Sequence, residues 1–267
     1  MQIGKRYPPF YVFLQQESIF NNWYHISYIE KKITVINMKG EYRAAMKICP
    51  QVYQVGGGNL SHPDDCCIYL VESKQGGVLI DAGAGRGTQR ILNNIKKLGF
   101  QPDQLKYIIL THGHIDHIGG VKELQMQTGA EVIAHELELD AIENGNPKLT
   151  AASWYGVEYQ PVLVNKVIKK DHESVPLGDI ELIFLHTPGH TPGSISVLCQ
   201  CAGNKVLFGQ DIHGPFNREW GSDLKEWRSS MQRLISLNAD ILCEGHFGIF
   251  QPAEKVRQYI ESCLRRY

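Results

Sequence analysis

Residues 111–117 concentrate side chains that bind metal ions. The segment reads Thr-His-Gly-His-Ile-Asp-His, so four of its seven residues are potential ligands. Neutral imidazoles and a carboxylate suit a borderline cation such as zinc, and they also accept iron or manganese. Clustered polar groups do not suit a protein core, because each buried group there needs a partner. The segment therefore predicts a metal site. Its candidate ligands are His112, His114, Asp116 and His117.

Three further candidate ligands lie downstream, each near a glycine at the end of an apolar run. They are His190, Asp211 and His246. The first segment also follows such a run, at residues 107–110. Glycine lets the backbone turn sharply, so the next side chain can point off the edge of a sheet. Loops at strand ends usually carry the functional residues of α/β proteins, so this repeated arrangement favours side chains that are placed there to bind a metal.

The elements that must position these residues alternate between strand and helix in two similar halves. Apolar spacing predicts helices at 88–98, 119–127 and 223–237, and a last one that begins at Pro252. Strands are expected near 51–55, 66–72, 78–81, 107–110, 131–134, 163–169, 180–185, 194–199, 205–208 and 240–243. This alternation predicts an α/β (α+β) architecture in which two sheets pack face to face with helices outside.

Composition excludes several classes of protein. The 267 residues include 43% apolar side chains, and the net charge is −1 without a basic stripe, which argues against nucleic-acid binding. No apolar run has the length of a membrane span, and no signal peptide is visible. The seven cysteines lack zinc-ribbon spacing and favour reduced, buried thiols, so we expect a cytoplasmic protein.

Residues 1–46 differ from the rest, because they are rich in aromatic side chains and hold no ligand cluster. One interpretation is an N-terminal arm that packs on the body, residues 47–267, or on a second copy in a homodimer. Another is an upstream stretch that translation does not use, since Met38 and Met46 could each be starts.

Together these motifs resemble the metallo-β-lactamase superfamily, whose signature is His-x-His-x-Asp-His followed by a separate His, an Asp and a last His. The resemblance covers roughly residues 50–250 and implies a four-layer αββα sandwich with two divalent cations at one edge, preferably zinc. The first cation would be held by His112, His114 and His190. The second would be held by Asp116, His117 and His246. Asp211 would bridge them together with a hydroxide.

The resemblance also implies roles in catalysis. The bridging hydroxide would attack an activated carbonyl, while Asp116 would orient it or pass a proton to the leaving group. Asp81 matches the family's acid behind a ligand histidine, although an N-cap or turn role is the alternative. His213, Tyr155 and Tyr159 are candidates for the substrate pocket, and the alternative for each tyrosine is a packed surface loop.

The resemblance implies a hydrolase acting on a small molecule, namely a lactone, a thioester or another ester. Only about twenty residues follow His246, which disfavours the glyoxalase II-like plan and slightly favours a lactonase-like one. The alternative from another class is a persulfide dioxygenase with a single iron, which the equivalents of His112, His114 and Asp211 would hold. A β-lactamase, a nuclease and a non-catalytic metal-binding protein rank lower.

Overall fold

Two β-sheets face each other in the computed structural model, which describes residues 42–267. The predicted N-terminal arm therefore lies outside the described residues except for 42–46, and its boundary stays a prediction. Met46 begins the first strand of a seven-stranded sheet in which neighbours along the chain are neighbours in space. Its strands are β1 (Met46–Cys49), β2 (Val52–Gly56), β3 (Ile68–Ser73), β4 (Gly76–Ile80), β5 (Leu105–Ile109), β6 (Glu131–His135) and β7 (Lys166–Ile168).

The second sheet has six strands in the order β13-β12-β11-β10-β9-β8. Its strands are β8 (His172–Leu177), β9 (Ile180–His186), β10 (Ile195–Cys201), β11 (Asn204–Gln210), β12 (Ile241–Glu244) and β13 (Ile249–Phe250). Strand β8 is absent from the predicted set. It lies at the sheet edge, where Pro176 is tolerated although it lacks the N–H that an interior strand residue donates. The proline and the polar residues around it hide the strand pattern in the sequence.

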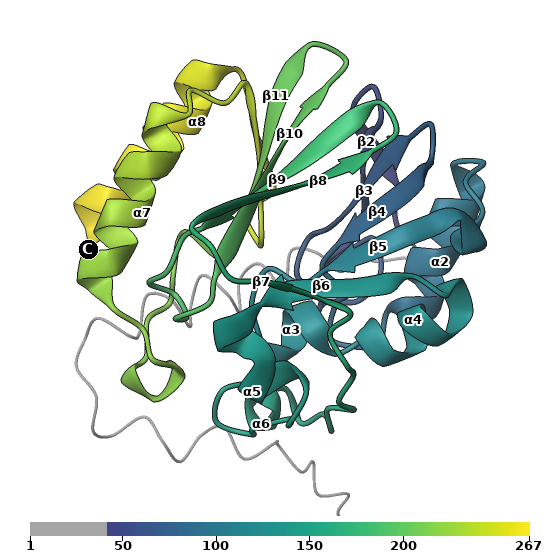
Figure 1. The fold of residues 1–267 in the computed structure, drawn as a ribbon, viewed down its shortest axis with the longest axis horizontal. Coiled ribbons are helices and arrows are strands. Elements are labelled where there is room, and N and C mark those ends of the chain that lie inside the picture. The colour runs from purple at the N-terminus through teal and green to yellow at the C-terminus, as the bar shows by residue number, and fades with distance from the viewer. Residues whose placement is uncertain (1–41) are drawn as a thin grey trace, which may run out of the picture. The chain divides into compact units, whose positions relative to one another are not determined.

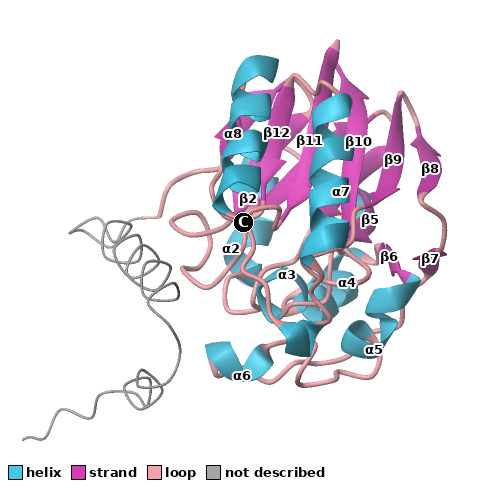
Figure 2. Cartoon of the chain, turned by 90° about the vertical axis from the view of Figure 1, so that its left-hand side faces the viewer, coloured by secondary structure: helices cyan, strands magenta, loops and turns pink. Residues whose placement is uncertain are grey.

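Helices cover the outer face of each sheet. Figure 1 shows α2 and α4 beside the first sheet and α7 and α8 beside the second, and Figure 2 shows α7 and α8 lying across the second sheet. The helices are α2 (Thr88–Lys97), α3 (Ile115–Ile118), α4 (Val121–Thr128), α5 (Leu139–Ile142), α6 (Ala152–Tyr155), α7 (Leu224–Ser236) and α8 (Ala253–Arg266). The short 3₁₀ helices are η2 (Pro102–Gln104), η3 (Glu136–Glu138) and η4 (Arg218–Trp220). No helix within 42–267 is long and apolar enough to cross a membrane.

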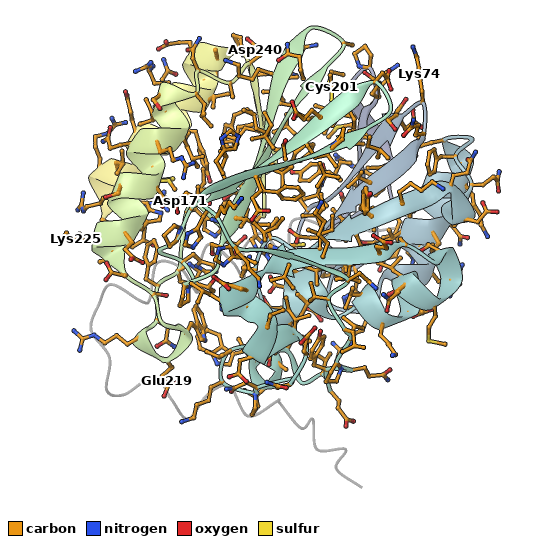
Figure 3. All side chains as sticks on the ribbon, viewed as in Figure 1. Lys74, Asp171, Cys201, Glu219, Lys225 and Asp240 are labelled. Atoms are coloured by element: carbon orange, nitrogen blue, oxygen red, sulfur yellow. The ribbon has the colours of Figure 1, made fainter. Side chains whose placement is uncertain are left out.

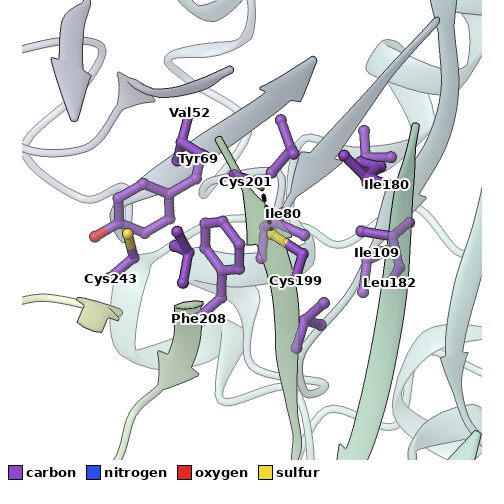
Figure 4. Packing of buried hydrophobic residues seen from close by; sticks show 14 of the residues in the cluster. Val52, Tyr69, Ile80, Ile109, Ile180, Leu182, Cys199, Cys201, Phe208 and Cys243 are labelled. Atoms are coloured by element: carbon purple, nitrogen blue, oxygen red, sulfur yellow. Dashed lines mark hydrogen bonds between the residues drawn. The ribbon is translucent and has the colours of Figure 1, made fainter. Parts of the chain in front are cut away.

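Apolar side chains form three buried layers that correspond to this order of elements. The middle layer lies between the sheets and includes Tyr69, Leu182 and Phe208 (Figure 4). One outer layer joins the first sheet to α2 and α4, and the other joins the second sheet to α7 and α8. Helices outside two facing sheets make the four-layer αββα sandwich, which confirms the predicted fold class.

The ligand loops leave the two sheets at a shared edge. Strands β9 and β11 each pair antiparallel with β10, and β12 pairs parallel with β11, so the three end on the same side. Backbone hydrogen bonds then join loops of the two sheets: Ile195 N–H donates to Thr111 O at 2.9 Å, and Cys67 N–H donates to Gly245 O at 2.6 Å. The direction of the strands and the bonds between the sheets thus bring ligand residues that are distant in sequence to the same edge.

Candidate metal centre

All seven predicted ligands come together at this edge. Among these seven residues, three groups each have ligand atoms within 4.8 Å of one another, and two of the groups share His117. The first ligand group is His112, His114 and His190, and the second ligand group is Asp116, His117 and His246. The third group, His112, His117 and Asp211, shares residues with both. Asp116 and His117 lie on the one-turn helix α3, not in a loop as the sequence suggested, and the helix directs both toward the centre.

The first group consists of three buried imidazoles with crowded nitrogens. His114 Nδ1 lies 3.0 Å from His112 Nε2 and 2.9 Å from His190 Nε2. Burial lowers the pKa of His112 and His114 well below the ordinary value, and it lowers the pKa of His190 to about 4. All three are therefore neutral near pH 7, which is the form of imidazole that binds a metal ion.

Hydrogen bonds at the opposite ring nitrogen fix the tautomer of two of the seven candidate ligands. His190 Nδ1 donates to Pro215 O at 2.7 Å, and His117 Nδ1 donates to Asp81 Oδ2 at 2.8 Å. Each bond leaves the Nε2 lone pair facing the centre. A partner on the far side of a ligand histidine is the usual way in which proteins orient such a ring.

The second group mixes imidazoles with carboxylates. His246 Nε2 lies 3.2 Å from Asp116 Oδ2 and 3.1 Å from Asp211 Oδ2. Burial by itself would lower the pKa of His246, but these carboxylates outweigh it and hold the pKa well above its ordinary value. His117 and His246 lower the pKa of Asp116 to about 2 against the opposing effect of burial. The carboxylates thus stay ionised and attract positive charge.

Buried atoms without partners test whether these residues fit a cation. His117 Nε2 and Asp211 Oδ1 are buried, lie 3.2 Å apart, and have no hydrogen-bond partner among the described residues. Leaving such atoms unsatisfied in a core is costly, whereas both are good ligands for a divalent ion. The residues therefore fit a metal, and the donor set of nitrogen and oxygen suits zinc, iron or manganese equally.

Glycine beside the ligands supplies space as well as turns. Gly189 adopts a left-handed φ of +136°, as the sequence argument requires before His190. Gly245 does not, but a Cβ at this position would collide with Asp211 Oδ1. The residue before His246 must therefore be glycine so that its backbone can approach Asp211 closely.

Asp81 lies behind His117 and adopts the left-handed region itself, with φ of 64°. Its carboxylate also accepts the Thr111 N–H at 2.8 Å, so both oxygens are used. Asn tolerates this backbone conformation but can accept at only one oxygen. We expect Asp81→Asn to weaken zinc affinity about 10–100-fold, measured by competition with a chromophoric chelator. Unchanged affinity would remove Asp81 from the support of His117.

The structure places the three candidate pocket residues in different surroundings. His213 is buried beside the centre, with its ring centroid 5.4 Å from that of His246, and its Nδ1 lies 2.5 Å from Glu244 Oε1. Tyr155 is half-buried on α6, where its carbonyl accepts from Arg86 at 3.5 Å. Tyr159 packs against the outer apolar layer of the first sheet, and its hydroxyl donates to Ile142 O at 2.9 Å.

Two residues that the sequence reading did not single out also contact the ligands. The centroid of the Trp220 ring lies 4.4 Å from that of His114 and 5.0 Å from that of Trp154. Glu244 Oε2 accepts the N–H groups of His246 and Phe247, both at 2.7 Å. The only sequence signal for Glu244 is an acid that ends an apolar strand two residues before a ligand. Trp220 stands in a polar loop and carries no signal.

Comparison with known proteins agrees with this geometry. The family model of the metallo-beta-lactamase superfamily matches residues 63–246. An N-acyl homoserine lactonase from Bacillus sp. is 31% identical over 155 residues, which are 49% of this chain and 57% of the relative. The probable metallo-hydrolase YflN of Bacillus subtilis is 30% identical over 218 residues, which are 71% of this chain and 81% of the relative.

Solved structures show the same architecture. A metallo-beta-lactamase from Cronobacter sakazakii with a HARLDQ motif superposes with a TM-score of 0.73 at 25% identity, covering 85% of this chain and 93% of that one. The metallo-beta-lactamase GOB-18 from Elizabethkingia meningoseptica shares the fold with a TM-score of 0.70 at 24% identity, covering 85% and 90%. With its family match, its relatives and its cluster of histidines and aspartates, the chain belongs to the metallo-beta-lactamase superfamily and is a metal-dependent hydrolase.

Proposed function

We propose that this hydrolase opens lactones, using two divalent cations held by the seven clustered residues. The relatives named as N-acyl homoserine lactonases support the lactone, although the chain spans only a little over half of their length. The wider class of thioesters and other esters shares the same carbonyl chemistry, so it forms the comparison set for the experiment below.

The position of Asp211 is the observation that carries this proposal. Its Oδ1 lies 3.2 Å from His117 Nε2, and its Oδ2 lies 3.1 Å from His246 Nε2 and 3.7 Å from His190 Nε2. One carboxylate therefore faces both ligand groups, as a bridge between two cations requires. Cations bound in this way would lower the pKa of a shared water and supply a nucleophile at neutral pH.

The remaining side chains transfer a proton and orient the ligand histidines. The pKa of Asp116 is held at about 2, so its carboxylate is ionised near pH 7 and accepts a proton only transiently. Its Oδ2 is 3.2 Å from His246 Nε2, so it lies within the second ligand group, where it would pass that proton to the leaving group. Asp81 and the Pro215 carbonyl meanwhile hold the rings of His117 and His190.

The aromatic surface beside the first ligand group supports a substrate with an apolar substituent. Trp220 is buried against His114, whereas Trp154, whose ring is tilted by 55° to that of Trp220, keeps 54% of its surface exposed. An exposed indole next to a polar centre offers apolar contact without blocking the ligands. A lactone that carries an acyl chain would use both features.

The first test is acid release in weak buffer from matched lactone, thioester, ester and β-lactam substrates. We expect release from the lactone, and a chelator should abolish it because the nucleophile depends on bound metal. Restoring zinc after removal of the chelator should restore the rate and serves as the control.

Two other outcomes would reject the lactone assignment. Faster chelator-sensitive release from another substrate would keep the hydrolase and change its substrate class. If metal-bound protein releases no acid from any of the four substrates, the result would favour iron-dependent oxidation of a sulfur compound, which oxygen uptake would reveal.

A further inference from the structure

A buried carboxylate outside the ligand set joins the loops that carry the first ligand group. Glu138 ends the 3₁₀ helix η3 after β6 and is 4% exposed. Its Oε2 accepts the Gly113 N–H at 2.7 Å, and its Oε1 accepts the Gly193 N–H at 2.8 Å. Gly113 separates His112 from His114, and Gly193 lies three residues after His190. One side chain thus bonds to both loops.

The two glycines are shaped to this side chain. A Cβ at Gly113 would lie 2.8 Å from Glu138 Oε2, and a Cβ at Gly193 would lie 2.7 Å from Glu138 Cγ. Neither distance is compatible with a real side chain, so both loops depend on close backbone approach to Glu138. Thr191 adds a third bond, because its hydroxyl donates to Oε1 at 2.7 Å.

These contacts cross between the two sheets. Residues 111–117 follow β5 of the first sheet, whereas His190 follows β9 of the second. The first ligand group takes histidines from both loops, so its geometry depends on how the loops are held together. We propose that Glu138 is a positioning residue that sets the separation of His112 and His114 from His190 and thereby sets metal affinity at the first group. This inference rests on the proposed ligand assignment.

Glu138→Gln is the variant that tests the proposal. Glutamine has nearly the same volume, but only one of its two terminal atoms can accept a hydrogen bond. Whichever way the amide turns, its NH₂ meets the N–H of Gly113 or of Gly193. One loop therefore loses its acceptor while packing is retained.

Two backgrounds separate the ligand groups. His246→Ala leaves the first group complete, and His190→Ala leaves the second group complete. Zinc affinity of the metal-free protein is measured by competition with a fluorescent chelator, so the readout does not depend on activity. We expect Glu138→Gln to weaken zinc binding about 10–100-fold in the His246→Ala background and to leave it unchanged in the His190→Ala background.

Asp240→Ala controls for a general loss of stability. Asp240 Oδ2 accepts the Lys205 N–H at 2.8 Å before β12 begins. Figure 3 shows Asp240 at the opposite end of the fold from Glu219, the neighbour of Trp220. The control variant should lower the thermal stability of the metal-free protein and keep zinc affinity in both backgrounds.

Equal losses from Glu138→Gln in both backgrounds, or none in either, would overturn the proposal. If Glu138→Gln fails to fold, Thr191→Val removes a single donor and should produce a smaller loss confined to the first group. Failure of the ligand assignment has a different signature, because His190→Ala or His246→Ala by itself would then leave two zinc ions bound.

Discussion

Asp211→Asn is expected to reduce kcat/KM for the hydrolysed substrate by about 10³-fold, which is the scale of losing a preorganised electrostatic contact in an active site. The amide keeps the size of the side chain but removes its negative charge and one acceptor. Because Asp211 faces His117, His190 and His246, the loss affects both ligand groups at once. Steady-state kinetics with excess zinc, together with metal content after dialysis, measures the effect.

A charge-matched control separates this effect from a change in overall electrostatics. Asp223→Asn removes one negative charge at the exposed start of α7, where Asn also caps a helix well. It should leave kcat/KM unchanged. Full turnover by Asp211→Asn with a complete metal content would reject the dinuclear mechanism, whereas lost turnover with only one bound metal would support the bridging position.

The ligand set could be predicted from sequence because its signals are local. Each ligand follows an apolar strand, and the strand pattern depends on side chains that are adjacent in the chain. Four of the seven ligands even lie within one short segment, 112–117. Helix α7 was equally visible, since it begins with Asp223 as its cap and buries one apolar face.

The residues that support the ligands could not be predicted in the same way. Glu138 bonds to Gly193, which is 55 positions away, and Tyr69 donates to the carbonyl of Glu244, which is 175 positions away. Such pairs depend on how the two sheets meet, and a single sequence carries no signal for that. The same limit explains Trp220, whose role follows only from its contact with His114.

The first and last residues of strands were also difficult to predict. Strand β7 covers only Lys166–Ile168 of the predicted 163–169, because Val162 and Val164 instead pack into the outer layer of the first sheet. Leu163 between them is 76% exposed, so this apolar run packs on one side without strand pairing. The apolar pattern thus overestimated the length of the element.

Glu244→Ala is expected to lower the free energy of unfolding of the metal-free protein by about 3–5 kcal/mol, because His213 Nδ1 and the N–H groups of His246 and Phe247 lose their acceptor at about 1–3 kcal/mol each. Glu244 is fully buried, and His213, which lies 2.5 Å from it, is only 4% exposed. Burial would raise the pKa of Glu244, but His213 outweighs this effect and lowers the pKa, so the carboxylate is ionised near pH 7. Urea unfolding followed by circular dichroism measures the loss.

A double variant distinguishes the hydrogen bond with His213 from the other contacts of Glu244. In Glu244→Leu/His213→Leu both polar partners are replaced by apolar side chains, so no buried imidazole is left without its hydrogen-bond partner. The N–H groups of His246 and Phe247 still lose their acceptor, which costs about 1–3 kcal/mol each if they stay buried. The double variant should therefore recover only part of the stability and should still bind zinc weakly at the second group. Full recovery of stability and affinity would mean that Glu244 serves His213 alone and does not hold the His246 loop.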